Sequence, residues 1–331
     1  MRFRVVALLF TLLLITKAFA SSDADSRGRD LIAKAAEKTN IFALSSFRLN
    51  ATVRIDNMGK PLDGTYSLLW NGPNLWREEI AFPGYSEIQV HSKGIAYLKR
   101  NVPYMPYRVS QLHATLGFSA GVGGGSFFNQ APHGQETIKK VHEQKIAGAK
   151  ADCVEIVNEL KHAREVCVDQ TTGMYNRGQQ RFVDSGFLPI GSKTFPRTMS
   201  LVDHEKPVVE VHITEFKAGE PLASALFEPP PGATSGQGCM NPVPGRLDNR
   251  IEPRYPEQDK TARNQGTVAI YAVIDKSGIP QNLQLVLRAT EGLDKASLDA
   301  VRQWRYTPAT CDDNPVETET IIEVHYTLSS Y

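Results

Sequence analysis

The chain has 331 residues, with 37 Lys and Arg against 36 Asp and Glu and a formal net charge of +1. This balance excludes bulk attraction to nucleic acid, because such binding depends on Lys and Arg that neutralise phosphates. At roughly 100 to 200 residues per domain, the length favours two domains.

The first residues have the order typical of a secretory signal. Arg2 and Arg4 precede an apolar run over 5–15, and Ala18-Phe19-Ala20 supplies small residues. We expect residues 1–20 to be a signal peptide cleaved after Ala20, and the mature protein to be periplasmic, with membrane association left open. The alternative is an uncleaved anchor, but the run is shorter than the roughly 20 apolar residues of a spanning helix, and Lys17 ends it.

Four cysteines in an exported chain favour disulfides, for which three connectivities exist. Cys153 and Cys167 lie symmetrically about residue 160, in two runs that predict a hairpin. Cross-strand neighbours are close enough to bridge, so we expect bonds Cys153–Cys167 and Cys239–Cys311. No two cysteines are two to four residues apart, which disfavours a metal site, and we expect no metal or cofactor.

The first two thirds of the chain alternate between polar and apolar residues, as half-buried strands do. A helix is expected from Ser26 to Lys38 and another over 107–118. The glycine-rich run 121–126 lacks the Gly-Lys-Ser/Thr ending of a phosphate loop. The predicted strands, which we expect to form one long antiparallel sheet, cover 46–55, 65–70, 75–82, 87–91, 95–98, 152–157, 164–169, 198–202 and 208–216.

This order of elements, with the exit Phe227-Glu228-Pro229-Pro230-Pro231-Gly232-Ala233, resembles the LolA/LolB lipoprotein-carrier fold. The resemblance covers a first domain that we place at 21–233. It implies an open antiparallel half-barrel with helices covering one face, whose concave apolar side holds acyl chains or another lipid. No functional residue of that family can be matched to a position here.

After a linker at 234–249, the remaining residues, 250–331, predict the order α-β-β-α-β. A short helix reaches Arg263, a strand begins at Gly266, and Asp275 to Gly278 form a turn. Leu283, Leu285 and Leu287 share one face of the next strand. An apolar stripe from Leu293 to Trp304 predicts a helix that Pro308 ends. The last strand alternates Ile322, Val324 and Tyr326 with Glu323 and His325.

This segment strongly resembles the TonB C-terminal domain. The resemblance rests on Tyr255, Pro256, Gly266, Gly278, Trp304 and Pro308. In that family the closing strand is an exposed edge to which a segment of an outer-membrane receptor adds as a further strand. We expect the partner-binding residues to be Thr318, Thr320, Ile322, Glu323, Val324, His325 and Tyr326. The alternative is a plain terminal strand, and Trp304 is expected to be a core residue.

Together these patterns predict an α+β protein of the cell envelope that acts by binding. The first domain would hold a lipid or lipoprotein-like apolar cargo, and the second would dock an outer-membrane receptor or another envelope protein. The alternatives are a scaffold protein without a ligand and a TonB-type energy transducer with an uncleaved anchor. The eight histidines are scattered, His204 and His212 included, and no catalytic motif occurs, so we expect no catalytic residue.

Overall fold

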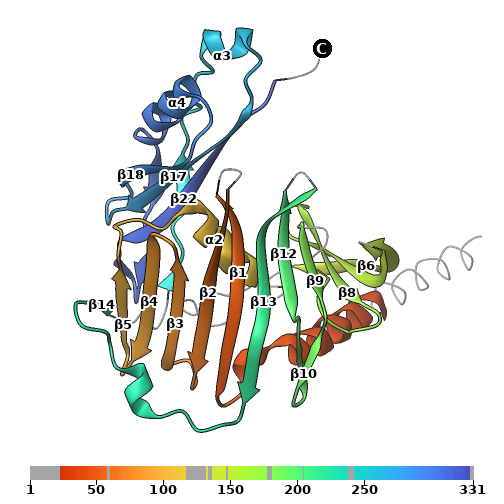
Figure 1. Ribbon diagram of the computed structural model, residues 1–331. Helices are drawn as coiled ribbons and strands as arrows, with labels where there is room; N and C mark the ends of the chain where they lie inside the picture. Colours follow the sequence, from red (N-terminus) through yellow and green to blue (C-terminus); the bar gives the residue numbers. More distant parts are fainter. Residues whose placement is uncertain are drawn as a thin grey trace, which may run out of the picture. The chain divides into compact units, whose positions relative to one another are not determined.

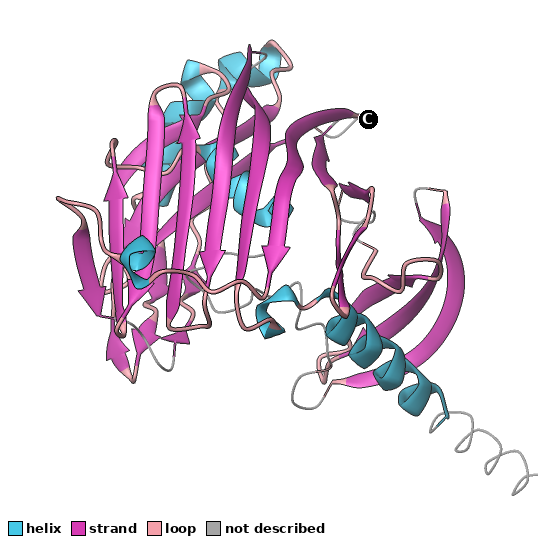
Figure 2. Cartoon of the chain, turned by 60° about the horizontal axis from the view of Figure 1, so that its bottom comes forward, coloured by secondary structure: helices cyan, strands magenta, loops and turns pink. Residues whose placement is uncertain are grey.

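The computed structural model describes residues 23–57, 60–116, 132, 136–146, 148–176, 181–203, 205–237 and 242–328. Its contacts divide the chain into two compact units (Figure 1). The first comprises Met1–Lys93 and His113–Pro230, and the second comprises Gly94–Leu112 and Pro231–Tyr331. Both consist mainly of open sheets with few helices (Figure 2). The α+β expectation is met in this general form.

The first unit contains antiparallel strands in the order β4-β3-β2-β1-β13-β12-β9. Their alternating sequences fit this arrangement, since successive side chains of a strand point to opposite faces of the sheet. The strands are β1 (Phe47–Asn57), β2 (Lys60–Trp70), β3 (Leu75–Phe82), β4 (Tyr85–Ser92), β9 (Phe182–Ser185), β12 (Thr198–Asp203) and β13 (Lys206–Ala218).

One face of this sheet is apolar and buried. The register sets the inward residues of neighbouring strands opposite one another, as in the pairs Leu49↔Leu68 and Val53↔Val211. The apolar face comprises Phe47, Leu49, Ala51, Val53, Ile55, Tyr66, Leu68, Trp70, Trp76, Ile80, Phe82, Met199, Leu201, Val209, Val211 and Ile213, all buried.

The predicted hairpin around residue 160 belongs to a separate sheet, which contradicts the expectation of one long sheet. Strands β6 (Thr137–Ile146), β7 (Ala149–Val157) and β8 (Ala163–Asp169) form it. A helix over 23–39 packs on one face through Ile32 and Ala35, which contact a core that includes Val154 and Val166 (Figure 2). The small sheet therefore covers the apolar stripe of this helix.

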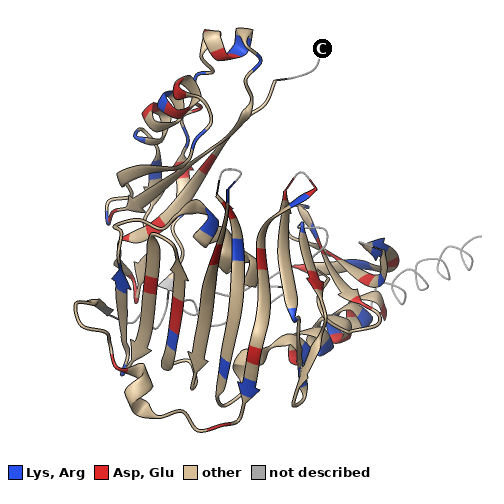
Figure 3. Ribbon diagram, viewed as in Figure 1, with Lys and Arg blue, Asp and Glu red and all other residues tan. Residues whose placement is uncertain are grey.

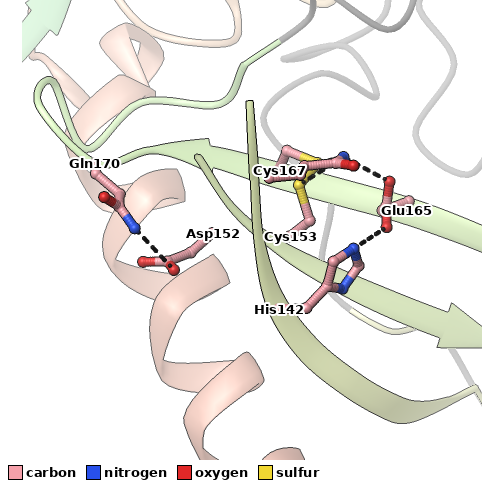
Figure 4. The surroundings of a disulfide bond; sticks show 7 residues. His142, Asp152, Cys153, Glu165, Cys167 and Gln170 are labelled. Carbon is pink, nitrogen blue, oxygen red and sulfur yellow. Dashed lines mark hydrogen bonds and ion pairs between the residues drawn. A yellow bond between two sulfur atoms is a disulfide. The ribbon is translucent and has the colours of Figure 1, made fainter. Parts of the chain in front are cut away.

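Cys153 and Cys167 face each other across β7 and β8 and form a disulfide (Figure 4). Their Cα atoms are 4.0 Å apart, and the register sets the two residues directly opposite each other. Glu165 and Gln144 lie beside the bond, and His142 contacts Glu165 at 3.1 Å. Cys311 is disulfide-bonded as well. The expected partner, Cys239, lies outside the described residues.

Smaller elements complete the first unit. They are η1 (Ile41–Ala43), β10 (Leu188–Ile190), β11 (Lys193–Phe195) and η4 (Ser224–Phe227). The signal segment 1–20, the glycine-rich run and His204 lie outside the described residues. No helix in the described part of the chain is long and apolar enough to cross a membrane.

The second unit is built around a sheet with the strand order β18-β17-β22, on which helix α4 packs. The core between them includes Val268, Ile270, Leu293, Val301 and Val324. Helix α2 (Tyr107–Leu116) is shared, because its residues up to Leu112 belong to this unit and those from His113 on belong to the first. The other elements are β5 (Ile95–Arg100), β14 (Thr234–Gln237), β15 (Pro242–Val243), β16 (Arg246–Asn249), α3 (Glu257–Thr261), β17 (Gly266–Ile274), β18 (Pro280–Leu287), α4 (Glu291–Val301), β19 (Arg305–Thr307), β20 (Thr310–Cys311), β21 (Asn314–Pro315) and β22 (Thr318–Tyr326).

Helix α4 is shorter than the sequence predicts. It ends at Val301 rather than continuing to Pro308, and the short strands β19, β20 and β21 precede β22. Trp304 nevertheless completes the core at 4% exposure, and its Nε1 donates to the carbonyl of Ile251 at 2.8 Å. The chain leaves the helix because β19 pairs with β16. The apolar spacing therefore identified the core position but not the helix end.

Gly278 is required by a close backbone contact. Its φ is +78°, and a Cβ there would lie 1.8 Å from the carbonyl oxygen of Tyr306. The amide of Tyr306 also donates to the carbonyl of Gly278 at 2.9 Å. Any side chain at residue 278 would therefore push β19 away from the turn.

We predict that Gly278→Ala destabilises the second unit by about 3 kcal/mol, because a collision with backbone adds to the cost of positive φ. Gly232→Ala is the matched control: its φ is +77° and nothing lies within 4 Å of the added Cβ. It should cost only about 1 kcal/mol. Urea unfolding of the full chain measures both, and equal losses would show that the Tyr306 contact is unimportant.

Candidate functional site

Strand β22 is an edge of its sheet. It pairs with the central strand β17 along its whole length, from Thr318↔Ile274 to Tyr326↔Gly266. In the part of the chain that the structure describes, no strand pairs with its other side. Adjacent residues of a strand direct their N–H and C=O groups to opposite sides. Half of the main-chain groups of β22 therefore face outward without a strand partner.

The apolar residues of β22 fix the strand on α4. Ile322, Val324 and Tyr326 belong to the core of the second unit. The hydroxyl group of Tyr326 lies 2.9 Å from that of Ser297, and burial raises the pKa of Tyr326. The Tyr255 ring packs edge-on against the Tyr326 ring at 5.2 Å. These predicted partner-binding residues thus support the edge rather than line its outer surface.

The opposite face of β22 is polar and carries contacts that the sequence did not indicate. Arg100 donates from two nitrogens to the carboxylate of Glu319, at 3.3 and 3.2 Å, and the Arg100 side chain is 7% exposed. The Tyr107 hydroxyl donates to Glu323 at 2.9 Å. Burial and the Glu319 carboxylate raise the pKa of Tyr271 to about 12. Segment Gly94–Leu112 therefore contacts β22 within the second unit.

The remaining predicted edge residues are more exposed. His325 has a side chain that is 61% exposed, and its ring nitrogens contact Glu323 at 3.4 Å and the Thr267 hydroxyl at 2.9 Å. Thr318 and Thr320 are partly buried. A chain lying along β22 would meet this polar side together with the outward main-chain groups.

The motif residues build the support of the edge. Tyr255 donates a hydrogen bond to the carbonyl of Asn264, and Pro256 immediately precedes α3. Asp259 of α3 is 5% exposed and accepts from the Thr290 hydroxyl, at 2.7 Å, just before α4. Thr290 in turn caps α4 by accepting from the amide of Leu293. Pro308 lies in the connection between β19 and β20.

The described residues contain no ligand set suited to a metal ion. The cluster of potential ligands that they form is Cys153, Glu165 and Cys167, and its two cysteines are already joined (Figure 4). A disulfide supplies no thiolate to a metal. His212 is exposed and contacts the Thr198 hydroxyl at 3.3 Å. Basic and acidic residues are interspersed on the strands and helices of both units (Figure 3).

Comparison with known proteins finds a family match within the second unit. Residues 251–328 match the Gram-negative bacterial TonB protein C-terminal family. Protein TonB of Vibrio cholerae serotype O1 is 31% identical over 98 residues, which are 29% of this chain and 40% of that protein. The chain therefore spans less than half of that relative.

Solved structures are similar to either part of the chain at low scores. A DUF1329 family protein from Desulfovibrio piger covers 62% of this chain and 97% of its own length, with 12% identity and a TM-score of 0.36. A LolA superfamily protein from Nitrosomonas europaea covers 61% of this chain and 97% of its own length, with 12% identity and a TM-score of 0.35. The Pseudomonas aeruginosa TonB C-terminal domain covers 28% of this chain and 94% of its own, with 19% identity and a TM-score of 0.24.

We predict measurable coupling between Arg100 and Glu319, because a bidentate, largely buried guanidinium contact is stronger than an exposed ion pair. In a double-mutant cycle to alanine, the coupling free energy should be about 1 kcal/mol after allowance for the 40% exposure of Glu319. The control cycle is Asp299 with Arg302, an exposed pair on α4, expected near zero. Equal coupling in both cycles would mean that Arg100 does not clamp β22.

Proposed function

We propose that this protein works in the periplasm by binding, and that its second unit captures an extended segment of an outer-membrane receptor or another envelope protein along β22. The observation that carries the proposal is the outer side of β22, which no described strand pairs with. The match of residues 251–328 to the TonB C-terminal family supports it. No catalytic step is part of this function.

The geometry fits strand addition. An incoming strand lies about 4.8 Å from its neighbour and bonds to the outward N–H and C=O groups. The rigid support of β22 by Tyr326 and Val324 keeps these groups aligned before the partner arrives, which lowers the ordering cost of binding. The polar face with Glu323 and His325 then offers side-chain contacts that distinguish one partner from another.

For the first unit we propose a lipid or lipoprotein-like apolar cargo. The support is the apolar face of β1, β2, β3, β12 and β13, which is continuous across these strands. We propose further that this face forms the concave side of an open half-barrel covered by helices. The second candidate, a scaffold without cargo, is favoured by one observation: the apolar residues are already buried, with Leu49, Leu68 and Ile213 at 0% exposure.

We predict that proline at one of two adjacent positions of β22 weakens partner capture while the second unit stays folded. Adjacent amides point to opposite sides of β22, so Val324→Pro and His325→Pro remove one inward and one outward donor. The variant that loses the outward N–H donor should bind synthetic receptor segments at least tenfold more weakly. The variant that loses the inward donor, which bonds to β17, should unfold the sheet. Fluorescence titration and circular dichroism measure the two effects.

Hydrogen exchange provides the independent check. The outward amides of β22 should exchange quickly in the free protein and become protected when a receptor segment binds. Protection confined to β18, or unchanged affinity in both proline variants while they remain folded, would refute strand addition at β22.

We also predict that the purified protein retains or takes up lipid. Native mass spectrometry of the chain from its own envelope should show bound lipid masses that disappear when the first unit is unfolded. Absence of any lipid adduct, together with no uptake of a fluorescent fatty acyl probe, would favour the scaffold.

A further inference from the structure

Two glutamates interrupt the apolar face of the first unit. Glu78 of β3 stands opposite Leu68, and Glu87 of β4 stands opposite Ile80. Their side chains therefore share the inward side of the sheet, since paired residues of an antiparallel sheet point to the same face. Glu78 is 1% exposed and Glu87 is 2% exposed. Buried carboxyl groups in an apolar surface require a physical reason, because burial disfavours their charge.

The two carboxyl groups differ in how well they are bonded. Glu87 accepts from the Tyr85 hydroxyl at 2.6 Å and from the Gln89 amide at 2.7 Å, one bond to each oxygen. Glu78 accepts from the Tyr66 hydroxyl at 2.7 Å through Oε1, while its Oε2 is buried without a hydrogen-bond partner. The hydrogen-bonding capacity of Glu78 is thus only partly used.

His113 of α2 faces the same region. It acts electrostatically on Glu78, and its own Nε2 is buried without a hydrogen-bond partner. Burial raises the pKa of Glu78, and the proximity of His113 opposes that shift. The charged groups that act on Glu78 among the described residues are His113 and Glu87, with no Lys or Arg. Among the described residues, the neighbours that act on the charge of Glu78 are therefore one histidine and one carboxyl group.

The buried carboxyl group of Glu78 destabilises the first unit, so stability does not explain its presence. A buried acceptor without a partner has lost its hydration without a compensating hydrogen bond, and an apolar residue of similar volume would pack against Leu68 without that cost. The cluster is also not a metal site, because Glu78, Glu87 and His113 do not form a group with ligand spacing in the described residues. An unused acceptor within an apolar face is the pattern of a site that orients an amphiphile by one polar contact.

We propose that Glu78 receives the polar head of the apolar cargo, and that this head is an amine or ammonium group. The proposal rests on the proposed cargo function of the apolar face. An amine supplies both the hydrogen-bond donor that Oε2 lacks and a positive charge between two carboxyl groups. A carboxylate or phosphate head would meet Glu78 and Glu87 with like charge and is disfavoured.

The test compares the affinities of amphiphiles that share one alkyl chain length and differ only in the polar head group. Dodecylamine, dodecanol and dodecanoate, each below its micellar concentration, compete with a neutral fluorescent naphthyl probe bound to the full-length protein. We expect dodecylamine to bind at least tenfold more tightly than dodecanol, and dodecanoate to bind most weakly. Glu78→Gln keeps an acceptor for Tyr66 but removes the acid, so it should reduce the preference for amine over alcohol at least tenfold while dodecanol affinity is retained.

Glu79→Gln is the matched control. Glu79 is the next residue of β3, points to the opposite face and pairs with Arg77, with 43% of its side chain exposed. This variant should keep the amine preference. Glu78→Leu provides a second replacement that removes the buried acid without leaving a polar atom, and it should also lose the preference. Equal loss in Glu79→Gln, or full preference in either Glu78 variant, overturns the proposal.

The outcomes also separate this inference from the cargo function. Binding of all three amphiphiles without amine preference in the unmutated protein overturns the role of Glu78 and leaves the apolar cargo standing. Failure of the probe and of every amphiphile to bind overturns both.

Discussion

The second unit depends on one constraint: the central strand β17 is paired on both sides, whereas the described chain pairs β22 on one side only. Hydrogen bonds to β17 and the burial of Val324 and Tyr326 hold β22 in place. An edge of this kind invites unwanted association. The charged residues of its polar face, and the ion pair of Glu319 with Arg100, limit that tendency.

The sequence predicted those elements in which local pattern and tertiary burial agree. Strand β3 has the predicted bounds, and β17 begins at Gly266 as expected. Strand β6 was missed because its apolar residues Ile138, Val141 and Ile146 do not alternate strictly and a register shift follows Ile138. The domain limits at 233 and 249 stay predictions. Residues 94–112, by contrast, group with the second unit through contacts that no local pattern indicates.

Tertiary contacts explain the remaining differences. The helical spacing from Leu293 to Trp304 correctly identifies core residues, yet α4 ends at Val301 because β19 must meet both β16 and the Gly278 turn. Arg100 and Glu319 are 219 residues apart in the chain, so their contact leaves no periodic signal. Glu78 and Glu79 are adjacent, and alternation alone does not say which of them points inward; the register with Leu68 does.

Both units, on the functions proposed, use the same physical device. Each contains hydrogen-bonding capacity that the described chain leaves unused: main-chain groups along β22, and one carboxylate oxygen at Glu78. The surroundings then set the class of ligand. A row of alternating N–H and C=O groups selects an extended peptide, whereas a single acceptor within an apolar face selects a molecule with a long apolar part and one donor at its end. A hydrogen-bonded tyrosine lies at each site, Tyr326 with Ser297 in one unit and Tyr66 with Glu78 in the other, and each leaves that capacity for the ligand.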